Sequence, residues 1–322
     1  MQRLLITLVL AVALTCLQAC SSSPAVTNSN VDRAHPLVGS IWAAGNAEFI
    51  DLKQLTSATA RVDYLLLGEV HDNPQHHIKQ ARLVAGFSGA PDTVSVGFEQ
   101  LVEAQSRPME LYVKANPKDA AGLGEAVGWA SSGWPDWSLY QPVFQQVLNR
   151  GWQPVPLMFS PDKSMSVLED GYSAVLGEEA LAVLQPDNAL SPGEQAEVEA
   201  LMYASHCGKL PKSMLPGMVR IQTAKDAYMA WVQAASGPRG VLIVGDGHAR
   251  KDRGIPLFLR RIMPGKVIAV VSMVEVEPGL TAPADYPQSQ SSHSDFVVFT
   301  TRHERGDPCE AITGGAMDHA AR

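Results

Sequence analysis

One stretch of the sequence, residues 61–77, constrains the fold more than any other. Its apolar run 64–67 predicts a strand buried on both faces, as in a parallel sheet. The dipeptide Asn73-Pro74 has the residue types of a helix N-cap and first helical position. Glu69 and His71 lie between strand and helix, at the end of the strand where open α/β sheets form their ligand crevices.

The same arrangement recurs far along the chain. A second apolar run, 240–244, is followed by Asp246 and His248, again in a Gly-acid-x-His turn. A third predicted strand, 93–98, ends at Glu99. One Gly-x-x-His turn carries little information, but two such turns after buried strands indicate a functional edge of the sheet. The polar residues that we expect at this edge are Glu69, His71, Glu99, Asp246 and His248.

The remaining pattern predicts the fold class and the domain organisation. Further strands are expected at 152–158, 266–274 and 296–300, and helices at 102–115, 120–130, 142–150, 191–206 and 213–235. No strand pattern occurs between 162 and 236. The prediction is an α/β fold, a mostly parallel central sheet flanked by helices, with an inserted helical lobe. Its segments are a signal peptide at 1–19, a tether at 20–39, a core at 40–161 and 237–310, the lobe at 162–236 and a tail at 311–322.

The N-terminus predicts export and lipid attachment. A basic residue precedes a short apolar run, 4–17, with the proportions of a signal peptide. The following Leu-Gln-Ala-Cys20 is similar to a bacterial lipobox, in which the cysteine is acylated. An ordinary signal peptide cut elsewhere is the alternative. Ser21 in place of Asp implies retention at the outer membrane, facing the periplasm.

Charge and cysteine content narrow the choice of partners. The full chain carries a net charge of −8, which argues against nucleic acid as a partner. Attachment to a membrane would then rely on lipid at Cys20. Cys207 and Cys309 are the cysteines left beyond that point, and an oxidising periplasm favours one disulfide between them over a thiol metal site.

The polar residues at the sheet edge suit two kinds of structure. His71, His248 and Asp246 would give a divalent metal ion a mixed nitrogen and oxygen site, with Glu69 or Glu99 as general base. The alternative is a buried network in which neighbouring carboxylates hold each imidazole.

An apolar ligand site is a second possibility. Trp134 and Trp137 lie in the aromatic stretch 133–142, which would form either a wall for a flat ligand or a packing plug. Methionines and tyrosines gather between 202 and 229, a composition typical of an apolar pocket or of ordinary helix packing. Arg250 and Arg253 would meet the carboxylates of a ligand such as haem, or form a solvated turn.

The other histidines receive no ligand role. His76 and His77 are adjacent on a predicted helix and point in different directions, so we expect surface or capping residues. The histidines placed in tether, loop or tail are His35, His293, His303 and His319.

Together these motifs resemble the ChaN-like haem-binding lipoprotein family, within a superfamily that includes erythromycin esterases and Tiki-type metalloproteases. The likeness covers about residues 40–310. The motifs are Leu-Gly-Glu-Val-His-Asp-Asn-Pro (67–74), Gly-Phe-Glu-Gln (97–100), Gly-Trp-Pro-Asp-Trp (133–137), His-Cys-Gly-Lys-Leu-Pro (206–211), Gly-Asp-Gly-His-Ala-Arg (245–250) and Asp-Pro-Cys (307–309).

The resemblance implies haem binding in haem and iron uptake, with a tyrosine as iron ligand and two haems stacked between paired subunits. Tyr203 and Tyr228 are the available tyrosines in the lobe. In the hydrolase branches of the superfamily, the two Gly-x-x-His turns and a Glu form the catalytic site, which maps here onto Glu69, His71, Glu99 and His248. A haem-binding protein is therefore the leading prediction, and a metal-dependent hydrolase or peptidase is the alternative.

Overall fold

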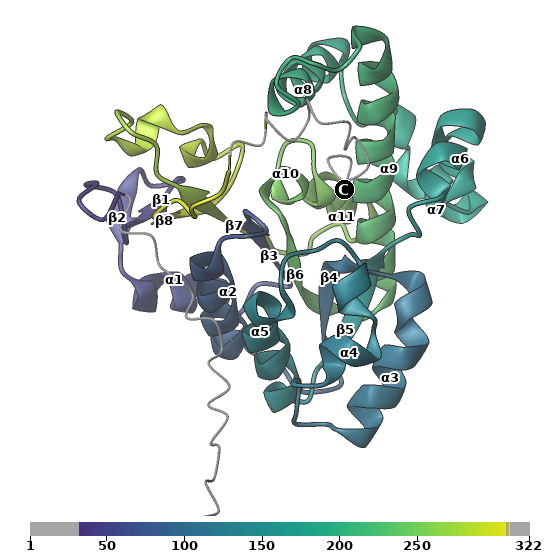
Figure 1. Cartoon of the computed structure of the whole chain (residues 1–322), viewed down its shortest axis with the longest axis horizontal. Coiled ribbons are helices and arrows are strands. Elements are labelled where there is room, and N and C mark those ends of the chain that lie inside the picture. Colours follow the sequence, from purple (N-terminus) through teal and green to yellow (C-terminus); the bar gives the residue numbers. More distant parts are fainter. Residues whose placement is uncertain (1–31, 307–308, 310–322) are drawn as a thin grey trace, which may run out of the picture.

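The computed structural model describes residues 32–306 and 309 (Figure 1). In this part, eight strands form one sheet in the order β2-β1-β8-β7-β3-β6-β4-β5. β3 to β8 pair in parallel, and β1 is antiparallel to both neighbours, which confirms the predicted fold class. The strands are β1 Ile41–Ala43, β2 Glu48–Ile50, β3 Tyr64–Glu69, β4 Val94–Val102, β5 Gln153–Met158, β6 Arg239–Gly245, β7 Ile268–Glu275 and β8 Phe296–Thr300.

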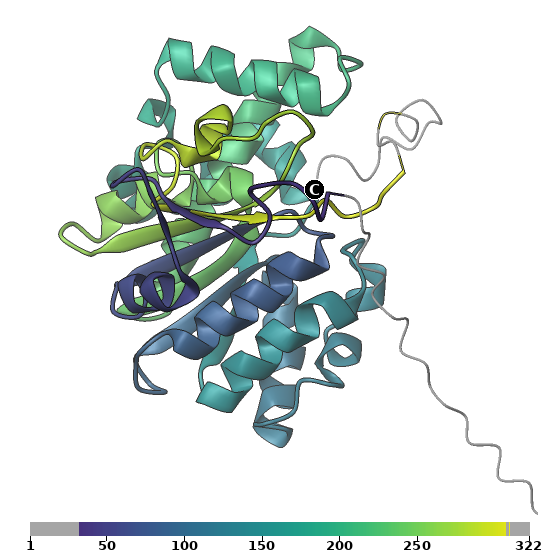
Figure 2. The ribbon, with the colours of Figure 1, turned by 90° about the vertical axis from the view of Figure 1, so that its left-hand side faces the viewer.

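Helices cover both faces of this sheet (Figure 2). α1 to α5 pack on one face, and α7, α9 and α11 pack on the other. The helices are α1 Leu52–Thr59, α2 Pro74–Gly86, α3 Ser106–Ala115, α4 Leu123–Ala126, α5 Trp137–Arg150, α6 Lys163–Asp170, α7 Glu178–Leu184, α8 Pro192–Ser205, α9 Leu215–Ala235, α10 Asp246–Ala249 and α11 Ile255–Ile262. No helix in the described ranges is long and apolar enough to cross a membrane.

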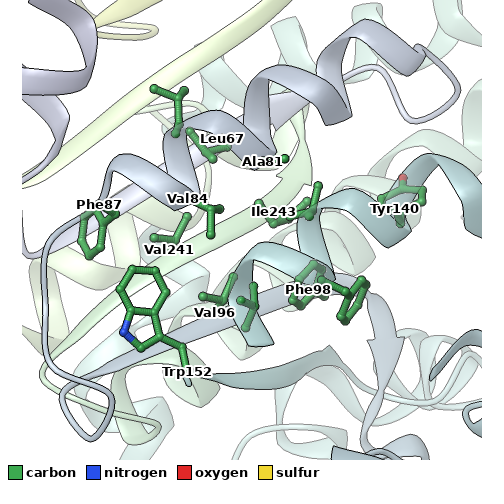
Figure 3. Packing of buried hydrophobic residues seen from close by; sticks show 14 of the residues in the cluster. Leu67, Ala81, Val84, Phe87, Val96, Phe98, Tyr140, Trp152, Val241 and Ile243 are labelled. Atoms are coloured by element: carbon green, nitrogen blue, oxygen red, sulfur yellow. The ribbon is translucent and has the colours of Figure 1, made fainter. Parts of the chain in front are cut away.

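The central strand β3 is buried on both faces, as its unbroken apolar run predicts. Leu65 and Leu67 contribute to the core under α2 and α5, while Tyr64 and Leu66 contribute to the core under α9 and α11. Figure 3 shows the first of these cores, where Phe98 stacks on Phe144 with ring centroids 3.8 Å apart. The alternation follows from the two-residue period of a strand and fixes which face each site residue reaches.

The strand order places a crevice at the ends of β3 and β6. The chain leaves β3 through α2 towards β4, and it leaves the neighbouring β6 through α11 towards β7 on the other side. These two helices lie on opposite faces of the sheet. Adjacent parallel strands with connections in opposite directions form the switch point at which open α/β sheets bind ligands.

Two sequence predictions about the fold are wrong. The helix expected at 142–150, with Pro142 at its start, begins earlier, at Trp137, because the Asp136 side chain caps α5 by accepting a hydrogen bond from Ser138 N. Leu37, which we assigned to the tether, is buried with Phe299, and Gly39 N donates to the carbonyl of Phe299. The folded part therefore begins before residue 40.

Several predictions concern residues outside the described ranges or stay untested. The signal peptide at 1–19, Cys20, most of the tether and the tail at 311–322 lie outside those ranges. The division into a core and a lobe at 162–236 stays a prediction. Within that segment, α9 packs on the sheet through Ala227, Met229 and Ala230, whereas α8 buries only Val198.

Candidate active site

Glu69 accepts several hydrogen bonds at the sheet edge. It ends β3, is 2% exposed, and lies on the α2 and α5 side of the sheet. Both of its oxygens are surrounded by donors. Oε1 accepts from Tyr140 Oη at 2.6 Å, Gln100 Nε2 at 2.9 Å and His71 Nδ1 at 2.9 Å, while Oε2 accepts from Gln80 Nε2 at 2.6 Å and lies 3.3 Å from His77 Nδ1.

The adjacent histidines are buried, contrary to the prediction of surface or capping residues. His77 contacts Glu69, its Nε2 lies 2.9 Å from the carbonyl oxygen of His71, and its ring packs 4.2 Å from that of Tyr140. His76 points elsewhere, accepting from Val70 N at 2.9 Å on Nδ1. The two rings point in different directions, as expected for neighbours on a helix, but both are buried in the protein.

A second carboxylate–imidazole group lies on the α9 side. Glu99 Oε2 accepts from Gly245 N at 2.6 Å, and its Oε1 lies 3.4 Å from His248 Nε2. The other ring nitrogen of His248 lies 2.6 Å from Asp226 Oδ1. Asp226 is a site residue that sequence reasoning missed, because it sits inside the apolar helix α9 without any motif around it.

His71 connects the two groups across the ends of the strands. A Cβ on Gly245 would lie 2.9 Å from His71 Nε2 and 3.5 Å from Glu99 Oε2, so the close approach requires glycine at 245. The His71 side chain is 31% exposed, and the ring of Trp134 meets it edge-on at 4.8 Å. His71 therefore lies at the rim of an otherwise buried network.

The electrostatics favour charged pairs in both groups. Burial opposes ionisation of Glu69 and Glu99, yet the adjacent imidazoles hold the pKa of Glu69 well below its usual range and that of Glu99 at about 2. Burial also opposes the charge of His71 and His248, but the carboxylates raise the pKa of His71 and raise that of His248 to about 10. An imidazolium at His71 can donate a hydrogen bond to an anion, whereas a metal ligand or general base must be neutral.

The predicted metal ligands do not come together. Asp246 begins α10, and its Oδ2 lies 3.5 Å from His293 Nε2 rather than beside His71. Among the residues that the structure describes, no group of three or more His, Cys, Asp or Glu side chains is placed to hold a metal ion. His293, which received no role from the sequence, is 5% exposed and faces Asp246.

The aromatic stretch divides between rim and core. Trp134 contacts His71 at the rim, as described above, whereas Trp137 packs on Trp129 with ring centroids 5.1 Å apart. The Trp137 ring also packs closely on Gly124, where an added Cβ would lie only 2.6 Å from the ring. Trp137 is thus mainly a packing residue. Tyr140 of the same stretch reaches Glu69.

The two tyrosines of the lobe have different surroundings. Tyr228 packs its ring against Phe159, with centroids 5.2 Å apart, and donates to Glu103 Oε2 at 3.0 Å. Tyr203 is half-buried on α8, with Lys212 Nζ 5.6 Å from its ring centroid. The predicted disulfide joins Cys207 to Cys309 just beyond α8.

The two arginines that we expect to bind the carboxylates of a ligand already form ion pairs within the protein. Arg250 forms a two-pronged pair with Asp252, at 2.9 and 2.5 Å. Arg253 Nη1 is buried without a hydrogen bond and lies 3.6 Å from Glu197 on α8.

A protein-family model described as haem-binding uptake, Tiki superfamily, ChaN matches residues 55–259, more than half of the chain. The chain belongs to this family. The match contains both carboxylate–imidazole groups and both tyrosines of the lobe, and it ends before His293 and Cys309. The family resemblance drawn from the sequence motifs is confirmed.

One solved structure supports the fold. A structure described as cofacial haem binding to ChaN of Campylobacter jejuni is 22% identical, with a TM-score of 0.63, covering 80% of this chain and 95% of that chain. The type III effector HopBA1 (12% identity, TM-score 0.41, 77% and 92% covered) and a mutant erythromycin esterase in its open conformation (13%, 0.35, 83% and 84%) are more distant. No curated protein matches the chain.

Proposed function

We propose that this protein binds haem and stores it or transfers it during haem uptake. Membership of a haem-binding uptake family is the observation that carries the proposal. The structure adds a surface of suitable chemistry on α8 and the turn that follows it.

The apolar side chains of this surface are accessible. Leu201 is 54% exposed and Met214 is 51% exposed, and the run from Ala200 to Ala204 on α8 is exposed or half-buried throughout. Leu201 lies on α8 and Met214 in the turn before α9, and exposed apolar side chains that form a patch mark a binding surface. Flexible methionine side chains adapt to the flat face of a porphyrin.

Tyr203 is the better placed of the two candidate iron ligands. Burial and the neighbouring Glu103 raise the pKa of Tyr228 to about 12, so its phenolate forms with difficulty. Tyr203 is half-buried and makes no hydrogen bond through its hydroxyl among the described residues, so this oxygen is free to bind iron. Arg253 Nη1 makes no hydrogen bond among the described residues and forms a long ion pair, 3.6 Å, with the exposed Glu197 on α8, so it would be able to bind one propionate.

A haem titration of the tag-free protein, followed at the Soret band, tests the proposal. Saturation at about one haem per chain is expected. Tyr203→Phe should shift the Soret band and weaken binding, while Tyr228→Phe serves as the matched control and should leave the spectrum unchanged. Non-saturating binding in the wild type argues against haem as the ligand, and unchanged spectra in both variants would exclude these tyrosines as ligands.

Membrane attachment and pairing are further parts of the proposal. Lipid on Cys20 would anchor the chain to the outer membrane, facing the periplasm. Mass spectrometry of the protein purified from membranes should find acyl groups on Cys20, and Cys20→Ser should release the protein to the soluble fraction. Haem is expected to bring two chains together, which sedimentation with and without haem would detect.

A metal-dependent hydrolase or peptidase is the second candidate, because His71 lies at the rim beside two buried carboxylates; a metal ion bound there would displace the proton of His71. This candidate requires His71→Gln to abolish hydrolysis of ester or peptide substrates in the presence of Zn²⁺. The same variant should leave the haem spectrum intact.

A further inference from the structure

A second polar cluster lies over the sheet on the face opposite Glu69. It consists of Asp246 at the start of α10, Ser272 on β7 and His293 in the loop before β8, and both Ser272 and His293 reach the Asp246 carboxylate. α10, which begins at Asp246, contacts both β3 and β7 (Figure 1). Nothing in the proposed haem surface or in the two carboxylate–imidazole groups uses these side chains.

The cluster is mostly buried, and its side chains face one another through long contacts rather than through good hydrogen bonds. His293 is 5% exposed and Ser272 is fully buried. Four buried atoms lack hydrogen-bond partners among the described residues: Asp246 Oδ1, Ser272 Oγ, His293 Nδ1 and His293 Nε2. Buried polar atoms in native proteins nearly always have a partner, and several atoms without a hydrogen bond in one place indicate a bound water or ion.

The distance between the two strongest metal-binding atoms, His293 Nε2 and Asp246 Oδ2, is the distance expected when both bind the same metal ion. His293 Nε2 lies 3.5 Å from Asp246 Oδ2, an ion-pair distance at the long limit of a hydrogen bond. Two atoms that each bind one metal ion at about 2.0–2.2 Å are separated by roughly 3–3.5 Å. The amide of Gln288 approaches the same Oδ2 at 3.4 Å, and exchanging its oxygen and nitrogen would present another oxygen ligand.

The backbone holds these side chains in place. A Cβ on Gly68 would lie 2.7 Å from Asp246 Oδ1, so glycine at 68 is what lets Asp246 reach the sheet. The carbonyl of His293 accepts from Lys251 N at 2.9 Å, and Ser294 Oγ closes the loop on the carbonyl of Gln288 at 2.7 Å. The Asp246 side chain keeps 18% exposure, which leaves a route for a small ion from solvent.

We propose that Asp246, His293 and Ser272 form a binding site for one divalent metal ion, separate from the haem surface. Carboxylate, imidazole and hydroxyl together suit a metal ion that accepts mixed nitrogen and oxygen ligands, such as Zn²⁺ or Co²⁺. The site has only two strong ligands, so water completes the coordination and the ion is exchangeable. The ion would link α10 to the loop before β8.

Metal titration of the haem-free, tag-free protein tests this site. After chelator treatment and dialysis, Co²⁺ should bind at one equivalent per chain with visible d–d absorption, and Zn²⁺ should displace it. Asp246→Asn and His293→Gln should each weaken Co²⁺ binding roughly tenfold or more. His303→Gln, another histidine near the sheet edge, is the matched control and should bind normally.

Other outcomes would overturn the proposal. If the wild type binds no Co²⁺ or Zn²⁺, the orphaned atoms bind water alone. If His71→Gln loses the ion while His293→Gln keeps it, the ion occupies the first site. Because a buried histidine variant can fail to fold, Ser272→Ala provides a milder change. It should weaken Co²⁺ binding and reduce the rise in the unfolding midpoint that Zn²⁺ gives the wild type, and unchanged values for both would also refute the site.

Discussion

The Tyr140 hydroxyl donates a 2.6 Å hydrogen bond to Glu69 Oε1, although the two residues are 71 positions apart. This bond ties α5 to the end of β3 and supplies one of the donors that keep a buried carboxylate charged. Since Glu69 also holds His71, the phenol indirectly positions the imidazole at the rim. A residue of the aromatic stretch thus helps to build the polar site.

Tyr140→Phe should destabilise the protein by about 2 kcal/mol, because a hydrogen bond to a charged group is removed and the carboxylate stays buried. Urea unfolding gives the free energy. Tyr112→Phe is the control, since its hydroxyl accepts only a neutral bond from Gly122 N, and its loss should be smaller. Equal losses in the two variants would contradict the assigned role of Tyr140.

Stability should fall as the pH rises above neutrality. The pKa of His248 is raised from 6.5 to about 10 in the folded state, so its contribution is complete below 6.5 and is lost as pH approaches 10. Urea unfolding across this window measures the slope, and His248→Gln should have a shallower one. If both proteins show the same slope, His248 is not a charged partner of Glu99 and Asp226.

The sequence predicts those parts of the site that depend on local pattern. Glu69, His71, Glu99 and His248 follow apolar runs, and parallel strands with buried faces must bring their carboxyl ends together. Asp226 could not be found in this way. It reaches His248 only because α9 crosses the face of the sheet, a packing relation without a local signal.

The histidine assignments failed for a similar reason. His76 and His77 lie on a helix whose polarity suggests solvent, but β8 and α5 cover both sides of its first turn. His76 Nε2 meets Thr300 Oγ1 at 2.9 Å, a partner 224 positions away. His293 and Asp246 likewise meet through a loop that the sequence leaves unplaced.

Gly245→Ala should disrupt the junction of the two groups. The added methyl would lie 2.9 Å from His71 Nε2, and we expect a loss of about 1–3 kcal/mol in the free energy of unfolding, together with displacement of the imidazole. Gly247→Ala is the matched control, because nothing lies within 4 Å of its added carbon. Thermal or urea unfolding compares the variants, and similar stabilities would argue against a tight contact at 245.

Removing the disulfide should affect both stability and haem binding. Cys207–Cys309 closes a separation of 102 residues, and a link of this length stabilises a chain by about 2–5 kcal/mol. A Cβ added to Gly208, the residue after Cys207, would lie 3.4–3.5 Å from the Tyr203 ring, so the turn packs against this tyrosine. Removing the disulfide should therefore also make the position of Tyr203 less fixed. The double variant Cys207→Ser, Cys309→Ser is therefore expected to unfold at lower urea and to bind haem more weakly than the wild type. If the double variant is clearly less stable but binds haem with unchanged affinity, the iron ligand lies away from this turn and is not Tyr203.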